Sequence, residues 1–191
     1  MGAITRAFAN NILTSGNFNA SALSGTLPAI SGASLTSLPS SNVTPSFHAY
    51  GNSITNAASG TWTKVPLQNE VFDNGSCFDN ATNYRFTPNV AGKYYLHARL
   101  VGFDNGNAMN NCRVSIYKNG SRYAGGYQWV TSGSTAPVRH FDVQIFTTDS
   151  ANGSTDYYEI YYYIQGGSTL YLSADGDTPR GISFYGHRIL E

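Results

Sequence analysis

The residues of this chain that could do chemistry are few and widely separated. Near the C-terminus, Asp175 and Asp177 flank a glycine, and two carboxylates in such a loop can bind Ca²⁺ together with backbone carbonyls. The same Asp-Gly-Asp sequence is also common in tight turns. We therefore treat Asp175 and Asp177 as weak calcium candidates and otherwise predict no metal and no cofactor.

The histidines and serines do not form a recognisable catalytic group. His48, His97, His140 and His187 are scattered along expected strands, and the Gly-x-Ser fragments lack the strand–turn–helix context of a hydrolase nucleophile. Catalysis needs a nucleophile with a base, paired carboxylates or a metal cluster. We therefore expect this protein not to be an enzyme.

Cys77 and Cys112 are the two cysteines of the chain. Two thiols without clustered histidines are too few ligands for structural zinc. Cys112 alternates with Val114 and Ile116, which predicts that its side chain points into a core. Both cysteines are interpreted as reduced, and a disulfide between them remains the alternative.

The charge balance restricts the partners. The 191 residues include 11 basic and 11 acidic side chains, a formal net charge of zero, and only 12% of all residues are charged. This argues against binding to nucleic acid, which needs a basic stripe, and against electrostatic attachment to a membrane. No apolar run approaches the roughly 20 residues of a membrane helix. The first residues are not a convincing secretory signal, which favours synthesis in a cytoplasm without standard export.

The elements that must position any site are β-strands. From Ser46 onward, apolar runs alternate with turn clusters, and no helical period of useful length occurs. About ten strands in two sheets make a jelly roll, which is the fold class that we predict. The candidate strands are Phe47–Tyr50, Thr61–Leu67, Glu70–Phe72, Tyr84–Thr87, Gly92–Phe103, Asn111–Lys118, Arg122–Val130, Arg139–Thr147, Tyr157–Gln165, Thr169–Ala174 and Gly181–Leu190.

Two of these strands have an unusually aromatic outer face. Every second residue from Tyr94 to Leu100 is apolar, so Tyr95, His97 and Arg99 must share the other face. The run from Asp156 to Ile164 is largely apolar or aromatic on both faces, and its second face would be a large exposed aromatic patch in a monomer. That second face holds Tyr157, Tyr161 and Tyr163, with Glu159 among them. We therefore expect another subunit to cover these faces; the alternative is that Tyr157, Tyr161 and Tyr163 stay in contact with solvent, since tyrosine tolerates a half-exposed position.

Three motifs resemble the globular head of complement 1q, in the tumour-necrosis-factor superfamily. The first motif of the family has four parts in order: Tyr-Asp, Gly-x-Phe-Thr, a Pro-x-x-Gly turn and Tyr-Tyr-Phe. In this chain the corresponding residues are Phe78-Asp79, then Asn83 with Phe86-Thr87, then Pro88 to Gly92, and then Lys93-Tyr94-Tyr95-Leu96. Val114 to Gly120 resembles the family's Val-x-Leu-x-Lys-Asn-Gly hairpin. Ser183 to Leu190 resembles its closing Thr-Phe-x-Gly-x-x-Leu strand. In order, the three motifs cover roughly Ser46 to Glu191.

The resemblance implies a ten-stranded jelly-roll sandwich that packs as a homotrimer through one sheet, with aromatic residues along the axis. Some members also bind calcium near the trimer apex. This chain departs from the pattern at Asn83, where glycine is usual, by one extra residue before Phe86, and by a Pro-to-Gly turn one residue longer. We predict a homotrimer whose interface includes Tyr95, His97, Tyr157, Tyr161 and Tyr163.

The first 45 residues differ in composition from the rest, with no Tyr, Trp, Asp, Glu or Lys. Ile4, Phe8 and Ile12 recur every four residues, which predicts one apolar stripe on a short N-terminal helix. Such a short helix is marginal alone in water, so a partner would have to order it; a disordered tail is the alternative. We predict that residues 1–20 anchor the chain to capsid or tail proteins of a particle. The anchor residues are Ile4, Phe8, Ile12, Leu13 and Phe18.

Residues 21–45 contain two inexact copies of a Leu/Ile-Ser-Gly pattern and a repeated Leu-Pro. Serine, glycine and proline alone would indicate a flexible linker, but recurring Leu and Ile suit three chains wound about one axis. The segment resembles the linkers of tail-fibre and other appendage proteins of tailed bacteriophages. We expect an extended trimeric stalk.

Loops rich in Asn, Gly, Ser, Tyr and Trp suit binding, because aromatic rings provide rigid contact area and small polar residues adapt. The candidate ligand-binding residues are Asn107, Tyr127, Trp129 and Arg180, for a host surface glycan or protein. The alternative is that these loops only close hairpins.

These observations together predict a structural protein of a bacteriophage virion, assembled in the host bacterial cytoplasm. It would be a short trimeric appendage, a tail fibre or a head fibre or capsid decoration, with residues 46–191 as an adhesive or stabilising knob. The alternative is a secreted recognition or signalling ligand of the complement-1q type, for which six Asn-x-Ser/Thr sequences could be glycosylated.

Overall fold

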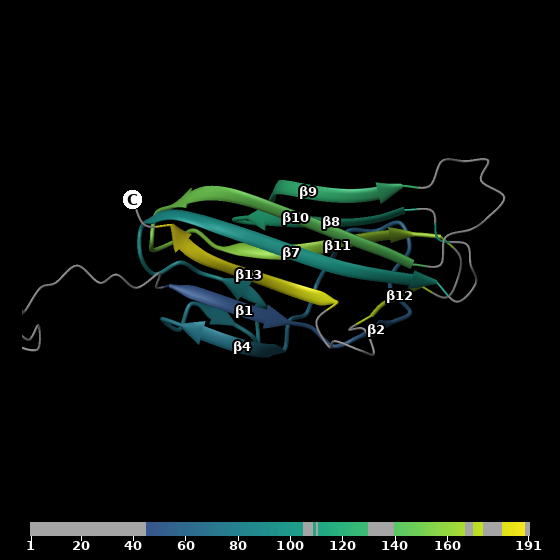
Figure 1. Ribbon diagram of the computed structural model, residues 1–191, viewed down its shortest axis with the longest axis horizontal. Helices are drawn as coiled ribbons and strands as arrows, with labels where there is room; N and C mark the ends of the chain where they lie inside the picture. Colours follow the sequence, from purple (N-terminus) through teal and green to yellow (C-terminus); the bar gives the residue numbers. More distant parts are fainter. Residues whose placement is uncertain are drawn as a thin grey trace, which may run out of the picture. The chain divides into compact units, whose positions relative to one another are not determined.

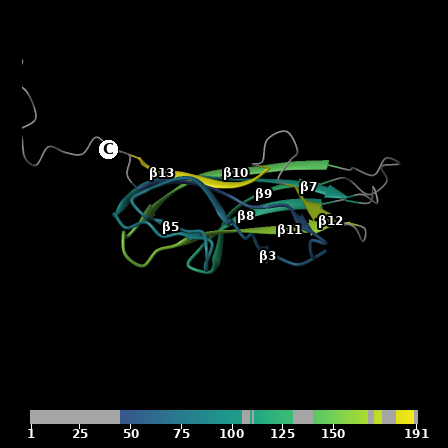
Figure 2. The same cartoon turned by 90° about the horizontal axis from the view of Figure 1, so that it is seen from below.

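The computed structural model describes residues 45–104, 109, 111–129, 140–166, 170–173 and 181–189. These residues form two β-sheets packed face to face (Figure 1). Turned by 90°, the same view shows the two layers, with β13 and β10 in one and β11 and β3 in the other (Figure 2). The expected anchor and stalk lie outside the described residues, except for Pro45.

The first layer is a seven-stranded sheet with the order β2-β12-β7-β13-β1-β4 and with β10 paired to the free side of β7. All of its pairings are antiparallel. Its strands are β1 (Ser46–Tyr50), β2 (Ile54–Thr55), β4 (Asn69–Asn74), β7 (Gly92–Asp104), β10 (His140–Ala151), β12 (Leu170–Leu172) and β13 (Ile182–Ile189).

The second layer is a six-stranded sheet with the order β5-β6-β11-β8-β9 and with β3 also paired to β11. Its pairings are antiparallel as well. Its strands are β3 (Thr63–Lys64), β5 (Phe78–Asp79), β6 (Arg85–Phe86), β8 (Asn111–Lys118), β9 (Ser121–Trp129) and β11 (Tyr158–Gln165).

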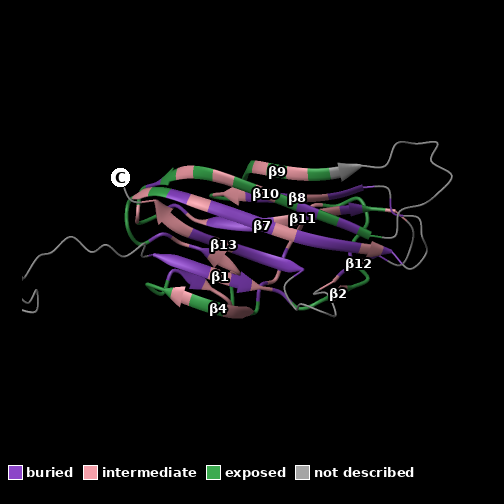
Figure 3. Ribbon diagram, in the orientation of Figure 1, coloured by how far each residue is buried: buried purple, intermediate pink, exposed green. Residues whose placement is uncertain are grey.

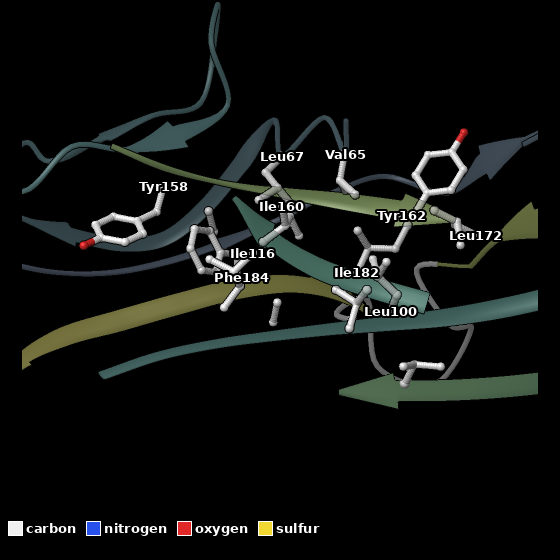
Figure 4. Packing of buried hydrophobic residues seen from close by; sticks show 14 of the residues in the cluster. Val65, Leu67, Leu100, Ile116, Tyr158, Ile160, Tyr162, Leu172, Ile182 and Phe184 are labelled. Atoms are coloured by element: carbon white, nitrogen blue, oxygen red, sulfur yellow. The ribbon is translucent and has the colours of Figure 1, made fainter. Parts of the chain in front are cut away.

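The core lies between the two sheets and follows from the period of two in the sequence. Leu100 and Phe184 point inward from the first sheet, and Ile116 and Ile160 meet them from the second (Figure 4). All four side chains have no exposed surface. Burial of a side chain of this size stabilises the folded state by about 1.5–3 kcal/mol. Strands that turn every second residue inward gain this stabilisation by packing against a second sheet.

One end of the core is aromatic. The ring of Phe47 lies 5.0 Å from Phe78, 4.5 Å from Phe86 and 5.0 Å from Phe184, measured between centroids. Phe47 and Phe184 belong to the seven-stranded sheet and Phe78 and Phe86 to the other. These stacked and edge-on pairs therefore join the two layers.

One edge of the sandwich closes through a glycine. In Figure 1, β9 and β10 run beside each other along the top, although they belong to different sheets. A Cβ atom added to Gly126 of β9 would lie 2.3 Å from the carbonyl oxygen of Gln144 in β10. Only a residue without a side chain allows the two backbones to approach this closely.

The turn between β8 and β9 explains one of the Asn-Gly-Ser sequences. Asn119 and Gly120 both have positive φ, 52° and 77°, which is the geometry of the two-residue hairpin turns that favour Asn-Gly. The side chain of Asn119 also accepts a hydrogen bond from the N–H of Tyr157 at 2.9 Å and donates one to Asp156 at 2.8 Å. This turn therefore also fixes the start of β11.

The expected all-β sandwich is confirmed. The differences are β10, which continues past the expected end at Thr147 to Ala151, and several short segments. The expected strand Thr61–Leu67 is reduced to β3, because Pro66 has no N–H to donate to a ladder. Two strands were not expected, β2 and β5, since each has only two residues and shows no alternation. The longer strands β7, β8 and β11 agree with their expected ranges to within one residue.

Candidate functional site

The outward face of the seven-stranded sheet carries a row of rings that crosses five strands. The register places these residues opposite one another from β4 through β1, β13 and β7 to β10. They point away from the core, since the residues next to them in sequence, such as Phe47 and Phe184, are fully buried. We name this row the aromatic stripe; it consists of Phe72, His48, Tyr185, His97 and Phe146.

Each ring of the aromatic stripe lies within contact range of the next. The centroid distances are 6.2 Å for Phe72–His48, 5.5 Å for His48–Tyr185, 4.6 Å for Tyr185–His97 and 6.3 Å for His97–Phe146. Phe72 is 43% exposed and Phe146 is 65% exposed, and Figure 3 shows exposed positions on β4 and β10, the strands that hold them. The stripe is therefore covered in its middle and open to solvent at both ends.

His97 is the most buried ring of the stripe. Its Nε2 lies 3.1 Å from Oε1 of Gln144 on β10, while its buried Nδ1 has no hydrogen-bond partner within the described residues. The neighbouring Tyr185 is half-buried, and burial, with a smaller contribution from Tyr95, raises the pKa of its phenol. A buried ring nitrogen without a partner is costly unless another molecule supplies one.

Polar pairs flank the stripe on both sides. Toward the N-terminus of β7, the ring of Tyr95 lies 5.4 Å from His187. Toward its C-terminus, the guanidinium of Arg99 donates to Asp142 at 2.7 Å, and this contact, opposed by burial, lowers the pKa of the Asp142 carboxyl. The face thus has aromatic residues at its centre and a polar rim, as protein interfaces do.

The residues predicted to form the trimer interface divide into two groups. Tyr95 and His97 lie on the outward side of β7, next to and within the aromatic stripe. Tyr161 and Tyr163 lie on β11 and Tyr157 immediately before it, in the other sheet. The two groups therefore lie on opposite outward faces of the sandwich, and a contact that includes both would join one face of one copy to the other face of its neighbour. The run of tyrosines had suggested a single surface since sequence alone does not assign strands to sheets.

The outward face of the six-stranded sheet combines aromatic and basic side chains. The ring of Trp62 lies 5.4 Å from Tyr163 and 6.3 Å from Tyr117, and Tyr117 stacks on Tyr161 at 4.0 Å. Two guanidinium groups lie over these rings, Arg122 at 4.9 Å from Trp62 and Arg113 at 5.1 Å from Tyr163. We name this surface the basic aromatic face; it consists of Trp62, Lys64, Arg113, Tyr117, Arg122, Tyr127, Glu159, Tyr161 and Tyr163.

A cluster of charged side chains around the hydroxyl of Tyr158 has a structural role. The hydroxyl of Tyr158 donates to Asp149 at 2.7 Å, and the ammonium of Lys118 lies 2.7 Å from Asp149 and 3.5 Å from Asp156. Burial raises the pKa of Asp149, but the hydrogen bonds from Lys118 and Tyr158 outweigh it and the net change is downward. The cluster joins β8, β10 and β11 and contains no nucleophile with a base.

The predicted ligand-binding residues are only partly described. Tyr127 lies on β9, 73% exposed, on the basic aromatic face. Trp129 is the last residue of β9, opposite Asn111 of β8. Asn107 and Arg180, the calcium candidates Asp175 and Asp177, and the anchor residues Ile4, Phe8, Ile12, Leu13 and Phe18 lie outside the described residues.

A small hollow opens beside β12. Its volume is about 220 Å³, and it is lined by Ser53, Phe103, Tyr171, Leu172 and Ser173. It is smaller than the roughly 300–1,000 Å³ of a typical ligand pocket. Among the described residues, no group of three or more His, Cys, Asp or Glu side chains could hold a metal ion. Within the same ranges, no helix is long and apolar enough to span a membrane.

Both cysteines are buried and free. The thiol of Cys77 donates to a carboxylate oxygen of Asp73 at 3.0 Å, and burial together with this carboxylate raises its pKa. Burial raises the pKa of Cys112 to about 12. Of the two interpretations drawn from the sequence, the described structure therefore has reduced thiols.

Sequence reasoning missed most of the aromatic stripe. Phe146 gave one signal: it follows Phe141, Val143 and Ile145 out of phase, so it is a large apolar residue at an outward position. His48, Phe72 and Tyr185 come from segments far apart in the chain, and only the strand order brings them together. The same holds for Trp62, which meets β8 and β9 only through the fold.

Solved structures show which known fold this is. Murine APRIL, crystallised at pH 5.0, has a TM-score of 0.52 and 13% identity, covering 75% of this chain and 98% of its own. The Eiger TNF protein from S. frugiperda has a TM-score of 0.52 and 10% identity, covering 76% of this chain and 92% of its own. No family model matches the sequence, and no curated protein matches it. At these identities the likeness shows the fold alone, a jelly roll of the TNF type.

Proposed function

We propose that this chain is a structural protein of a bacteriophage virion, with the jelly roll as the knob of a short homotrimeric appendage. Three copies associate through the aromatic stripe. Residues 21–45 form the stalk, and residues 1–20 attach it to capsid or tail proteins. The knob acts by binding or by stabilising the particle, without catalysis and without a cofactor.

The observation that carries self-association is the exposure of Phe146 and Phe72 at the two ends of a continuous row of rings. Aromatic residues in such a patch mark interaction sites on soluble proteins. A second copy on this face would cover both phenylalanines and could offer a partner to Nδ1 of His97. The contact is heterologous and closes as a three-membered ring.

Features of the sequence support the number of copies and the particle. The recurring Leu and Ile of residues 21–45 need neighbours that one extended chain lacks, and three chains about one axis supply them. The resemblance of this segment to phage appendage linkers supports the virion, and the apolar spacing of Ile4, Phe8 and Ile12 supports an anchor.

Two measurements test the proposal. Sedimentation velocity of the full chain should give the mass of a trimer at micromolar concentration, and a monomer would overturn the assembly. Cryo-electron microscopy of the intact particle should show three-fold knobs. Knobs on the capsid would make this a head fibre or decoration protein, and knobs on the tail a tail fibre. Absence from every particle would overturn the virion assignment.

A further inference from the structure

The basic aromatic face has a composition that the aromatic stripe lacks. Its outward positions hold Trp and Tyr rings, guanidinium groups, a serine and a glycine. No Leu, Ile, Val or Phe points outward from the described parts of β3, β8, β9 and β11. Tyr, Trp and Arg also occur in protein interfaces, whose fully buried centres are the more apolar part. This face offers π surfaces and hydrogen-bond donors fixed by neighbouring side chains.

We propose that the basic aromatic face binds an acidic polysaccharide. Sugar rings stack their C–H faces on exposed aromatic rings such as Tyr127, which is 73% exposed, and uronate carboxylates accept paired hydrogen bonds from guanidinium groups. The inference rests on the proposed adhesive function and names its ligand class. It concerns strand positions of the six-stranded sheet, not the loops that the sequence suggested.

The arginines are held in place for this task. Nε of Arg122 donates to Oγ of Ser115 at 3.1 Å, which orients the guanidinium plane over Trp62. Gly125 makes room for it, because a Cβ there would lie 2.7 Å from Nη2 of Arg122. Since Nε carries the orienting bond, a carboxylate ligand can approach the terminal nitrogens in a forked geometry.

Arg113 is oriented in the same way. Its Nε donates to the side-chain oxygen of Asn111 at 3.1 Å, and its guanidinium lies over Tyr163. Tyr127 stands opposite Arg113 in the register, on the neighbouring strand, and is 73% exposed. The guanidinium of Arg113 thus lies between two rings, Tyr127 and Tyr163, in a row that crosses β9, β8 and β11 and ends at Trp62, just before β3.

The charge of the face selects the ligand. Among its described residues, Arg113, Arg122 and Lys64 are cations, and Glu159 is the carboxylate between them; it forms an ion pair with Lys64. The local excess is positive although the whole chain is neutral. Two oriented guanidinium groups suit the planar carboxylates of a polyuronate better than a nucleic acid, whose phosphates call for a longer basic track.

The two outward faces are compatible with one assembly. Association through the aromatic stripe uses the seven-stranded sheet, and the basic aromatic face belongs to the six-stranded sheet. A trimer would then carry three identical glycan faces, and simultaneous contacts along one polysaccharide would raise the apparent affinity.

The test uses the full chain with three immobilised probes: polygalacturonate, dextran as a neutral polysaccharide, and single-stranded DNA. We expect binding to polygalacturonate and none to dextran. Arg122→Gln and Tyr127→Ala should each weaken it about tenfold or more. Tyr127→Ala separates loss of binding from misfolding, because that side chain is mostly exposed and its removal should leave the fold intact. Lys93→Gln, which removes an exposed charge at the end of β7, is the matched control and should bind like the unaltered protein.

Each contrary result has a defined meaning. Equal binding to dextran, tighter binding to DNA, no binding to polygalacturonate, or an equal loss with Lys93→Gln would overturn the glycan inference. Sedimentation of the same samples reports assembly separately. A trimer that binds no polyuronate would overturn the glycan inference and leave the proposed assembly standing. A monomer that binds polyuronate, with weaker apparent affinity, would overturn the trimeric assembly and leave the glycan inference standing.

Discussion

The imidazole of His97 and the phenol of Tyr185 lie 4.6 Å apart, centroid to centroid, at the centre of the aromatic stripe. The pair joins β7 to β13 in the register, and its neighbours Phe146 and His48 extend the contact over β10 and β1. An interface of this kind concentrates its binding energy in central, desolvated aromatic residues. The exposed end at Phe146 is the place to test such an interface, because a charge there should leave the fold of one copy intact.

We predict that Phe146→Asp strongly weakens self-association. The side chain is 65% exposed in one copy, so the change should leave the fold intact while it places an unpaired carboxylate in the interface. The dissociation constant should rise about 100-fold, equivalent to roughly 2.7 kcal/mol. Sedimentation velocity at several concentrations measures it.

The matched control is Tyr127→Asp, the same introduction of a carboxylate at a 73% exposed aromatic residue on the other sheet. It should leave the mass in solution unchanged. Dissociation of this control together with retention of the trimer in Phe146→Asp would place the interface on the six-stranded sheet instead.

We predict that Asp79 makes folding stability depend on acid pH. The N–H of Thr82 foremost, and then the side chain of Asn83 and the N–H of Ala81, stabilise its carboxylate against a smaller effect of burial and lower its pKa to about 2. A depressed pKa in the folded state adds stability that is fully present above the unfolded value near 4 and is lost as the pH falls through 2. Asp79→Asn should therefore be less stable than the unaltered protein at pH 7.

Urea unfolding at a series of pH values from 7 to 2 measures this difference. The difference in the free energy of unfolding between Asp79→Asn and the unaltered protein should be constant above about pH 5 and should shrink toward pH 2. The uncharged exposed change Ser121→Ala should run parallel to the unaltered protein. A gap that stays constant down to pH 2 would show that the Asp79 hydrogen bonds do not depend on ionisation.

We predict that neither cysteine reacts in the folded protein. Cys77 and Cys112 are buried, and raised pKa values keep both as thiols at neutral pH, whereas the thiolate is the reactive form. Titration with a disulfide reagent should detect almost no free thiol before unfolding and both cysteines after guanidinium is added. Ser121→Cys provides a reactive positive control on an exposed strand position. Immediate reaction of the unaltered folded protein would contradict the burial of one of these thiols.

The parts of the fold that the sequence predicted are those with strong alternation. Tyr94 to Leu100 and Tyr158 to Ile164 each bury every second residue, and both strands lie where the period of two placed them. The family signature around Phe86 and Gly92 was sufficient to indicate the jelly roll despite its departures. Local pattern and family motif thus determine the long strands.

The functional surfaces could not be predicted in the same way, because they depend on which strands become neighbours. Tyr157, Tyr161 and Tyr163 look like the partners of Tyr95 and His97 in sequence, yet β7 and β11 belong to different sheets. Trp62 comes from a segment with only two strand residues, and its contacts to Tyr117 and Arg122 arise from long-range pairing. Periodicity reports which way a residue points and does not report what lies beside it.

We predict that Gly126→Ala destabilises the sandwich. The added Cβ would meet the carbonyl oxygen of Gln144 at 2.3 Å and its carbonyl carbon at 3.1 Å. These are backbone atoms, so rotation of a side chain cannot relieve the contact and β9 must move away from β10. Overpacking of this kind costs about 1–3 kcal/mol, and the midpoint of urea unfolding should fall accordingly. Ala124→Gly removes a methyl group from the same strand and should lower the free energy of unfolding by less, about 0.5–1 kcal/mol. A variant of Gly126 as stable as the unaltered protein would show that β9 and β10 can separate without loss of stability.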